Sequence, residues 1–109
     1  MLFFVRFDLT QPANVSNDEL VATWIREAEA AMGAMDAGAV THLWKVAGQR
    51  IVLAVVDLPT AEDLDRALGG LPIIREMGPG VKTEAWPIYD YRTFAADLNA
   101  GAYGGASPG

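Results

Sequence analysis

The sequence contains no cysteine and only one histidine among its 109 residues. Disulfides, thiolate zinc sites, iron–sulfur clusters and a cysteine nucleophile are therefore excluded, and His42 alone cannot form a multi-histidine metal site. Basic residues are also few, since eight Lys and Arg stand against 14 Asp and Glu for a net charge of −6. This acidity opposes the phosphates of nucleic acid and of anionic membranes, so we expect neither as a partner.

Long hydrophobic runs are missing as well. The apolar start at residues 1–7 is broken by Arg6, and it is far shorter than the roughly 20 residues of a membrane helix or the core of a signal peptide. We therefore expect a cytoplasmic protein. A hydrophobic content of 51 % with 20 % charged residues fits one small packed domain.

Strand and helix patterns alternate along the chain. Stretches rich in β-branched and aromatic residues predict strands, and stretches rich in Ala, Glu, Met and Leu between capping residues and glycines predict helices. The predicted strands are residues 2–9, 40–46, 50–57 and 81–89, and the predicted helices are residues 17–37 and 60–68. This βαββαβ order predicts an α+β, ferredoxin-like fold, with four antiparallel strands and both helices on one face.

We place a single domain over residues 1–98. After the fourth strand we predict an extended arm through Phe94, and we predict a flexible Gly/Ala-rich tail over residues 99–109, which has little apolar surface with which to order itself.

The third strand is apolar on both sides. Ile51, Leu53 and Val55 alternate with Val52, Ala54 and Val56, and a strand of this kind is normally covered on both faces. With helices on only one face, the other face needs a partner, and a second copy of the chain would supply it as a sheet-on-sheet homodimer. A monomer with one sticky strand is the alternative.

Glu27 is the first candidate for chemistry. At about 100° per residue it falls beside the predicted apolar sector of the first helix. A carboxylate among apolar neighbours loses hydration, which raises its pKa and suits it to act as a general acid or base. In the alternative interpretation, Glu27 reaches water or forms an ion pair with Arg6 or Lys45.

Further candidates are polar and aromatic residues near the strands. His42 could shuttle a proton, and Arg50 could bind a carboxylate through two hydrogen bonds, although a satisfied histidine and an exposed arginine are the ordinary alternatives. Aromatic side chains could wall a site for an unsaturated ring or form an oligomer interface. The predicted substrate-binding residues are Phe4, Trp24, Trp44 and Tyr89.

Phosphate loops, dinucleotide glycine patterns and nucleophile elbows are absent from the sequence, which leaves cofactor-free acid–base chemistry on a small molecule.

Several blocks together resemble the muconolactone Δ-isomerase family over about residues 1–90. They are Met1–Phe3, His42–Gly48, Asp57–Pro59 and Leu71–Pro72. The resemblance implies a ferredoxin-like fold in a dimeric α+β barrel, homodimers assembled into rings such as decamers, and no metal or coenzyme. It also implies a reaction that moves a proton in an unsaturated lactone and shifts its double bond. The general base would be a helix glutamate, at the position of Glu27.

Three positions depart from the family's pattern, in which a histidine, a basic residue and a tyrosine are usual where this chain has Phe4, Ala39 and Arg50. These changes predict a rewritten, more apolar pocket, with Arg50 replacing the lost charge. Besides a muconolactone-type isomerase, we consider an isomerase or cyclase of a polyketide or other secondary-metabolite intermediate. A cofactor-free monooxygenase and a non-catalytic small-molecule binder are further alternatives.

Overall fold

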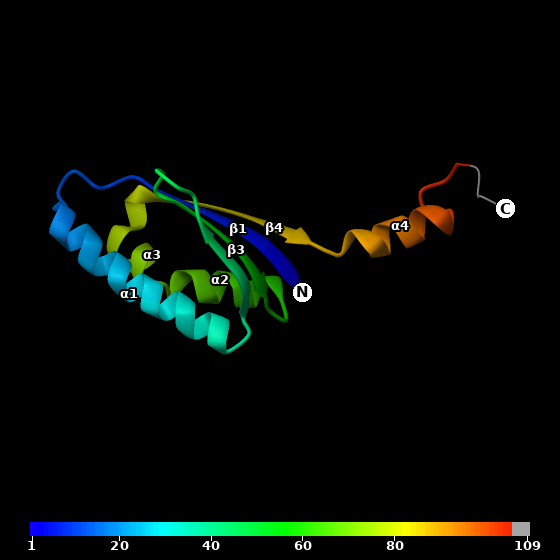
Figure 1. Ribbon diagram of the computed structural model, residues 1–109, viewed down its shortest axis with the longest axis horizontal. Coiled ribbons are helices and arrows are strands. Elements are labelled where there is room, and N and C mark those ends of the chain that lie inside the picture. The colour runs from blue at the N-terminus through cyan, green and yellow to red at the C-terminus, as the bar shows by residue number, and fades with distance from the viewer. Residues whose placement is uncertain (106–109) are drawn as a thin grey trace.

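The computed structural model describes residues 1–105 and shows a four-stranded sheet with helices on one side (Figure 1). Its elements are β1 (Leu2–Leu9), α1 (Asn17–Asp36), β2 (Val40–Lys45), β3 (Ile51–Asp57), α2 (Ala61–Gly69), α3 (Pro72–Met77), the short 3₁₀ turn η1 (Gly78–Gly80), β4 (Val81–Ile88) and α4 (Tyr91–Asn99). The strand order is β2-β3-β1-β4, and all neighbouring strands are antiparallel. The predicted ferredoxin-like α+β architecture is therefore confirmed.

Side chains cap the starts of the two main helices. The Ser16 hydroxyl accepts a hydrogen bond from the Glu19 N–H at 3.1 Å, and the Thr60 hydroxyl accepts one from the Asp63 N–H at 3.1 Å. Each bond satisfies a backbone donor that the helix itself leaves free. The cap at Ser16 therefore sets the start of the helix that carries Glu27.

The strand register separates two chemically different sheet faces. Successive side chains of a strand point to opposite sides, so Phe3, Val5 and Phe7 face the helices while Phe4 faces away. Val5 is fully buried and packs in a core with Phe3 and Leu64. The face toward the helices is the inner face, and the face away from them, to which Phe4 belongs, is the outer face.

Two segments differ from expectation. Residues 72–77 form the unpredicted helix α3, which starts at Pro72, a residue whose fixed φ and missing N–H suit the first helical turn. The predicted extended arm through Phe94 is wrong, because residues 91–99 form α4. Its cap is Asp90, whose carboxylate accepts from the Arg92 N–H at 2.7 Å. Figure 1 shows α4 extending away from the sheet and the other helices.

The division into a domain at 1–98 and a flexible tail stays a prediction. The structure describes turns over residues 100–103, with Gly101 at a φ of +81°. The last part of the predicted tail, residues 106–109, lies outside the described residues.

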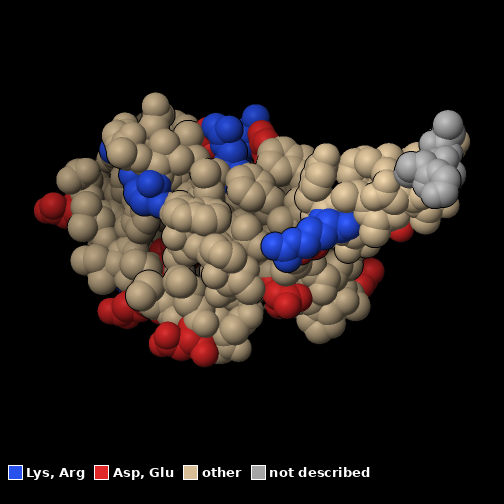
Figure 2. Space-filling view, turned by 45° about the vertical axis from the view of Figure 1, so that its right-hand side comes forward, with Lys and Arg blue, Asp and Glu red and all other residues tan. Residues whose placement is uncertain are grey.

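Charge is spread unevenly over the surface. In Figure 2 most of the visible face is made of uncharged residues, with acidic side chains along its lower edge and basic ones in separate spots. The basic residues in this view form no continuous stripe, as expected for a chain with a net charge of −6. Among residues 1–105, no helix is long and apolar enough to cross a membrane.

Candidate active site between the sheet and the helices

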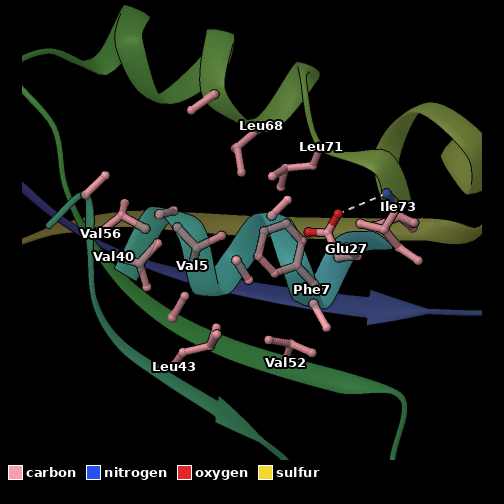
Figure 3. Close-up of a pocket in the computed structure, with 18 of the residues that line it drawn as sticks. Val5, Phe7, Glu27, Val40, Leu43, Val52, Val56, Leu68, Leu71 and Ile73 are labelled. Atoms are coloured by element: carbon pink, nitrogen blue, oxygen red, sulfur yellow. Dashed lines mark hydrogen bonds between the residues drawn. The ribbon is translucent and has the colours of Figure 1, made fainter. Parts of the chain in front are cut away.

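A cavity of about 180 Å³ lies between the inner face of the sheet and the helices. Figure 3 shows side chains from both layers converging on it. The strands contribute mostly β-branched residues, whereas α1 contributes short alanines, which leave the space between helix and sheet unfilled. The residues that define its walls include Val5, Phe7, Val52 and Val56 from the sheet, Ala28, Ala31 and Ala34 from α1, and Leu64 and Leu68 from α2. Because tightly packed interiors are the rule, this gap is suited to an apolar ligand.

Glu27 places a carboxylate on this apolar cavity. Its side chain is half-buried, and its Oε2 accepts a hydrogen bond from the Ile73 N–H at 3.1 Å (Figure 3). Burial raises the pKa of Glu27 above its ordinary value of 4.5, and the hydrogen bond from Ile73 opposes part of that rise. The expected position of Glu27 on the apolar side of α1 is thus confirmed.

Among the described residues, Glu27 forms no ion pair with Arg6 or Lys45. Arg6 contacts Asp8 at 3.4 Å on the outer face, and the Lys45 ammonium donates to the Val46 carbonyl at 3.0 Å. The hydrogen-bond partner of Glu27 is instead a backbone N–H of α3, and a side-chain pattern in the sequence cannot predict a backbone donor. Sequence reasoning missed it, and Pro72 immediately before Ile73 was the only local signal that a helix starts there.

Arg50 is the second charged residue on the cavity, at the entry to β3. Its guanidinium donates to the Gln11 side-chain oxygen at 3.3 Å, and the residue is exposed. Together with Trp24 and Ala28, Arg50 also lines a second, shallow groove along α1. These three residues therefore border both spaces and mark an opening of the cavity to solvent.

Trp24 forms part of this opening. Its ring lies 5.9 Å from the Lys45 ammonium, a distance compatible with a cation–π contact. Of the predicted substrate-binding residues, Trp24 is the one that the structure places on the cavity.

Phe4, His42 and Trp44 lie on the outer face, away from Glu27. Phe4 stacks on Trp86 with ring centroids 5.6 Å apart, and His42 stacks on Trp44 at 5.4 Å. The strand register explains this, since Phe4 and His42 both pair with Val55 while Leu43 pairs with Ala54 and points inward. Within one chain, the structure does not bring His42 to the carboxylate of Glu27.

Tyr89 follows β4 and is 60 % exposed. It belongs to the segment leading to α4 and does not line the cavity. Of the three positions that depart from the family's pattern, Ala39 and Arg50 line the cavity, but Phe4 does not. The expectation that all three lie in one pocket is therefore wrong for Phe4.

A metal centre has no support in the described chain. Within residues 1–105, no group of three or more His, Asp or Glu side chains could hold an ion. The charged groups available at the cavity are one carboxylate and one guanidinium, which suit proton transfer and the binding of an oxyanion.

The fold and the site together define a ferredoxin-like α+β protein with a half-buried acid on an apolar cavity. The model of the family described as muconolactone delta-isomerase matches residues 1–85. The chain belongs to this family. It is also similar to the solved crystal structure of muconolactone isomerase at 3.3 Å resolution, with a TM-score of 0.71 and 27 % sequence identity over 83 % of this chain and 90 % of that one. A comparison with curated proteins found no significant match.

Proposed function

We propose that the protein is a cofactor-independent isomerase that moves a proton within an unsaturated lactone or a related enolisable small molecule. The observation that carries this proposal is Glu27, a half-buried carboxylate with a raised pKa on an otherwise largely apolar cavity. The pKa of such a base must be high enough for the carboxylate to take a proton and near enough to neutral pH for the resulting acid to release it again. Family membership supports the same reaction class.

In this proposal the two oxygens of Glu27 have different tasks. Oε2 accepts from the Ile73 N–H, and Figure 3 shows the other oxygen, Oε1, directed into the cavity. Oε1 takes an acidic C–H proton of the unsaturated lactone, so that the C–H bond breaks and the electron pair is delocalised into an enolate conjugated with the carbonyl. The same carboxyl then returns the proton to the other carbon terminus of this conjugated enolate, and the double bond shifts with no net gain or loss of atoms.

Arg50 supplies the positive charge for this reaction. Its guanidinium lies at the opening of the cavity, where it can bind a substrate carboxylate or stabilise the enolate oxygen. Trp24 beside it gives the opening an apolar wall for an unsaturated ring. His42, on the outer face, has no place in this proton path within one chain.

The apolar lining favours a substrate with little charge. Ala39, one of the three positions that depart from the expected family pattern, lines the cavity with a methyl group. A polyketide-type or other secondary-metabolite intermediate fits this lining as an alternative to muconolactone, with the same enolisation followed by proton return or cyclisation.

The experiment is proton NMR of muconolactone in D₂O with the wild-type protein. Migration of the ring double bond with deuterium entry at carbon is expected, and Glu27→Gln should abolish both. Glu29→Gln is the matched control, because Glu29 is exposed on the same helix.

Migration that persists in Glu27→Gln would overturn the assignment of the base. No exchange in the wild type would reject muconolactone and move the proposal to the polyketide-type substrate. Oxygen consumption would identify a monooxygenase, and saturable binding without turnover would identify a binder.

We also propose that the chain forms homodimers through the outer face. Trp44 and Trp86 are 50 % and 47 % exposed there, and Ile51, Leu53 and Val55 of β3 extend the apolar surface between them. A contiguous aromatic and aliphatic sheet face of this kind is typical of a protein interface. Sedimentation velocity should find a dimer or a larger ring of dimers such as a decamer. A monomer at micromolar concentration would contradict the proposal.

A further inference from the structure

The short helix α3 is tied to α1 at two neighbouring places. At the first, Glu27 accepts from the Ile73 N–H at 3.1 Å. At the second, Arg26 donates to both carboxylate oxygens of Glu76, with Nε 3.3 Å from Oε2 and Nη2 in contact with Oε1. Arg26 and Glu27 are consecutive, and Ile73 and Glu76 lie one turn apart on α3. The ion pair and the bond to the proposed base therefore join the same two helices side by side.

The buried Thr23 side chain contacts both residues of the Arg26–Glu76 ion pair. Its side chain is 2 % exposed, and its hydroxyl lies 3.3 Å from Glu76 Oε1 and 3.4 Å from Arg26 Nη2. A buried hydroxyl needs hydrogen-bond partners, and here both partners belong to the ion pair. This arrangement fixes the position of Glu76 more narrowly than a lone surface pair would.

Helix α3 depends on such ties for its position. It spans six residues, too few to be stable by itself, and its cap residue Leu71 provides no side-chain hydrogen bond. Pro72 has no N–H, so the Ile73 N–H is the first free donor of the helix, and Glu27 satisfies it. A small shift of α3 would lengthen this bond and change the proton affinity of Glu27.

We propose that Arg26 and Glu76 are positioning residues that hold α3 so that the Ile73 N–H stays on the Glu27 carboxylate. Neither side chain lines the cavity; both act through Ile73. The inference rests on the proposed function of Glu27 as the base, but the contact itself can be tested without any substrate.

The other charges near Glu27 are few. From the sheet, Arg50 lines the same cavity, and from α3 the charged residues are Arg75, which donates to the Gly69 carbonyl at 3.3 Å, and Glu76. From α2, the side chains on the cavity are apolar. On α1 itself, Arg26 and Glu29 flank Glu27. A titration must therefore separate the position of α3 from the direct effect of the charges on Arg26 and Glu76.

Two variants make this separation by the sign of their effects. Arg26→Met removes a positive charge and Glu76→Ala removes a negative one, so through-space electrostatics alone would raise the pKa of Glu27 in the first and lower it in the second. Release of α3 instead weakens the Ile73 bond in both. Because that bond favours the charged carboxylate, the proposal predicts a higher pKa of Glu27 in both variants.

The readout is NMR titration of protein with ¹³C-labelled glutamate carboxyls, with Glu27 assigned by its loss in Glu27→Gln. The Ile73 amide resonance is followed in the same samples. In the wild type it should shift with the ionisation of Glu27, and in both variants this pH-dependent shift should shrink or vanish. Glu76→Gln, which keeps acceptors for Arg26 and Thr23, should largely restore it.

Arg66→Met is the matched control, since Arg66 pairs with Asp63 at 2.9 Å on α2 and makes no tie to α3. It should leave the titration of Glu27 unchanged. Opposite shifts in Arg26→Met and Glu76→Ala, or an Ile73 amide that still follows Glu27 in both, would overturn the proposal. If the titrations behave as expected while Glu27→Gln remains active, the positioning role stands and the proposed function falls.

Discussion

The two faces of the same sheet differ in what they present. The inner face carries Val52, Ala54 and Val56 toward a cavity that contains one carboxylate, whereas the outer face carries stacked aromatic rings and, within residues 1–105, is covered by no helix. Both faces come from strands that alternate strictly, except for a register shift between Val40 and His42. Alternate residues of one strand therefore belong to separate surfaces: the inner set lines the cavity of the proposed reaction site, and the outer set forms the face of the proposed dimer.

The largest expected effect concerns the outer face. Replacing Trp44 and Trp86 together by Ala should weaken dimerisation by at least about 2 kcal/mol, roughly 30-fold in Kd, because exposed aromatic anchors dominate such interfaces. Sedimentation equilibrium measures this change. Ile25→Ala is the control, since it removes a 56 % exposed apolar side chain from α1 instead. Equal weakening by Ile25→Ala would mean that the interface lies on the helices.

A second prediction concerns the volume of the inner cavity. Ala31→Leu extends a side chain into the space beside Glu27 and should lower kcat/KM about tenfold on a substrate that the wild type turns over, because it displaces the substrate from the base. Ala22→Leu makes the same change on an exposed site of the same helix and should be neutral. Steady-state kinetics and thermal melts compare the two. Full activity in Ala31→Leu would place the substrate elsewhere.

A third prediction concerns the helix that carries Glu27. Ser16→Ala removes the cap of α1 and should reduce the free energy of unfolding by about 1 kcal/mol, because the Glu19 N–H loses its partner. Urea denaturation provides the measurement. Thr93→Ala, on the exposed part of α4 where Asp90 provides the cap, should change stability by less than about 0.5 kcal/mol. Equal losses in the two variants would contradict a capping role for Ser16.

The smallest expected effect is a pH dependence of stability. Because the native pKa of Glu27 is raised above 4.5, the folded state binds this proton more tightly than the unfolded chain does. Its contribution to stability is present below pH 4.5 and is lost as pH rises through the native pKa. In Glu27→Gln the free energy of unfolding does not fall for this reason. The variant should therefore gain stability relative to the wild type as pH rises from 4 to 7, as measured by urea titrations. A relative gain toward low pH would show that the native pKa is lowered.

Patterning along the chain predicted most of the fold. The strand at residues 2–9 has the predicted bounds, and α1 begins at residue 17 as predicted, because alternation and helix starts depend on nearby residues. Helices α3 and α4 were not predicted. The first is too short for a periodic pattern, and the second depends on the cap at Asp90 in a segment whose aromatic residues favour an extended chain.

The site was predictable only in part. The helical position of Glu27 follows from periodicity alone, but its partner is the Ile73 backbone, 46 residues away in sequence, and backbone donors carry no sequence signature. Alternation also placed His42 and Trp44 on one side of β2 without saying which side faces the helices. That choice follows from the pairing of β2 with β3, in which Leu43 meets Ala54 over the cavity.

The most direct test of the inner cavity as the reaction site is NMR with a bound unsaturated lactone and ¹³C-methyl-labelled alanine. Ala31 and Ala34 line the cavity on the inner side, while the indoles of Trp44 and Trp86 lie on the outer face. If the inner cavity is the reaction site, intermolecular NOEs are expected from the lactone to the methyl groups of Ala31 and Ala34. NOEs to the two indoles alone would contradict this site, because the ligand would then occupy the sheet face opposite Glu27.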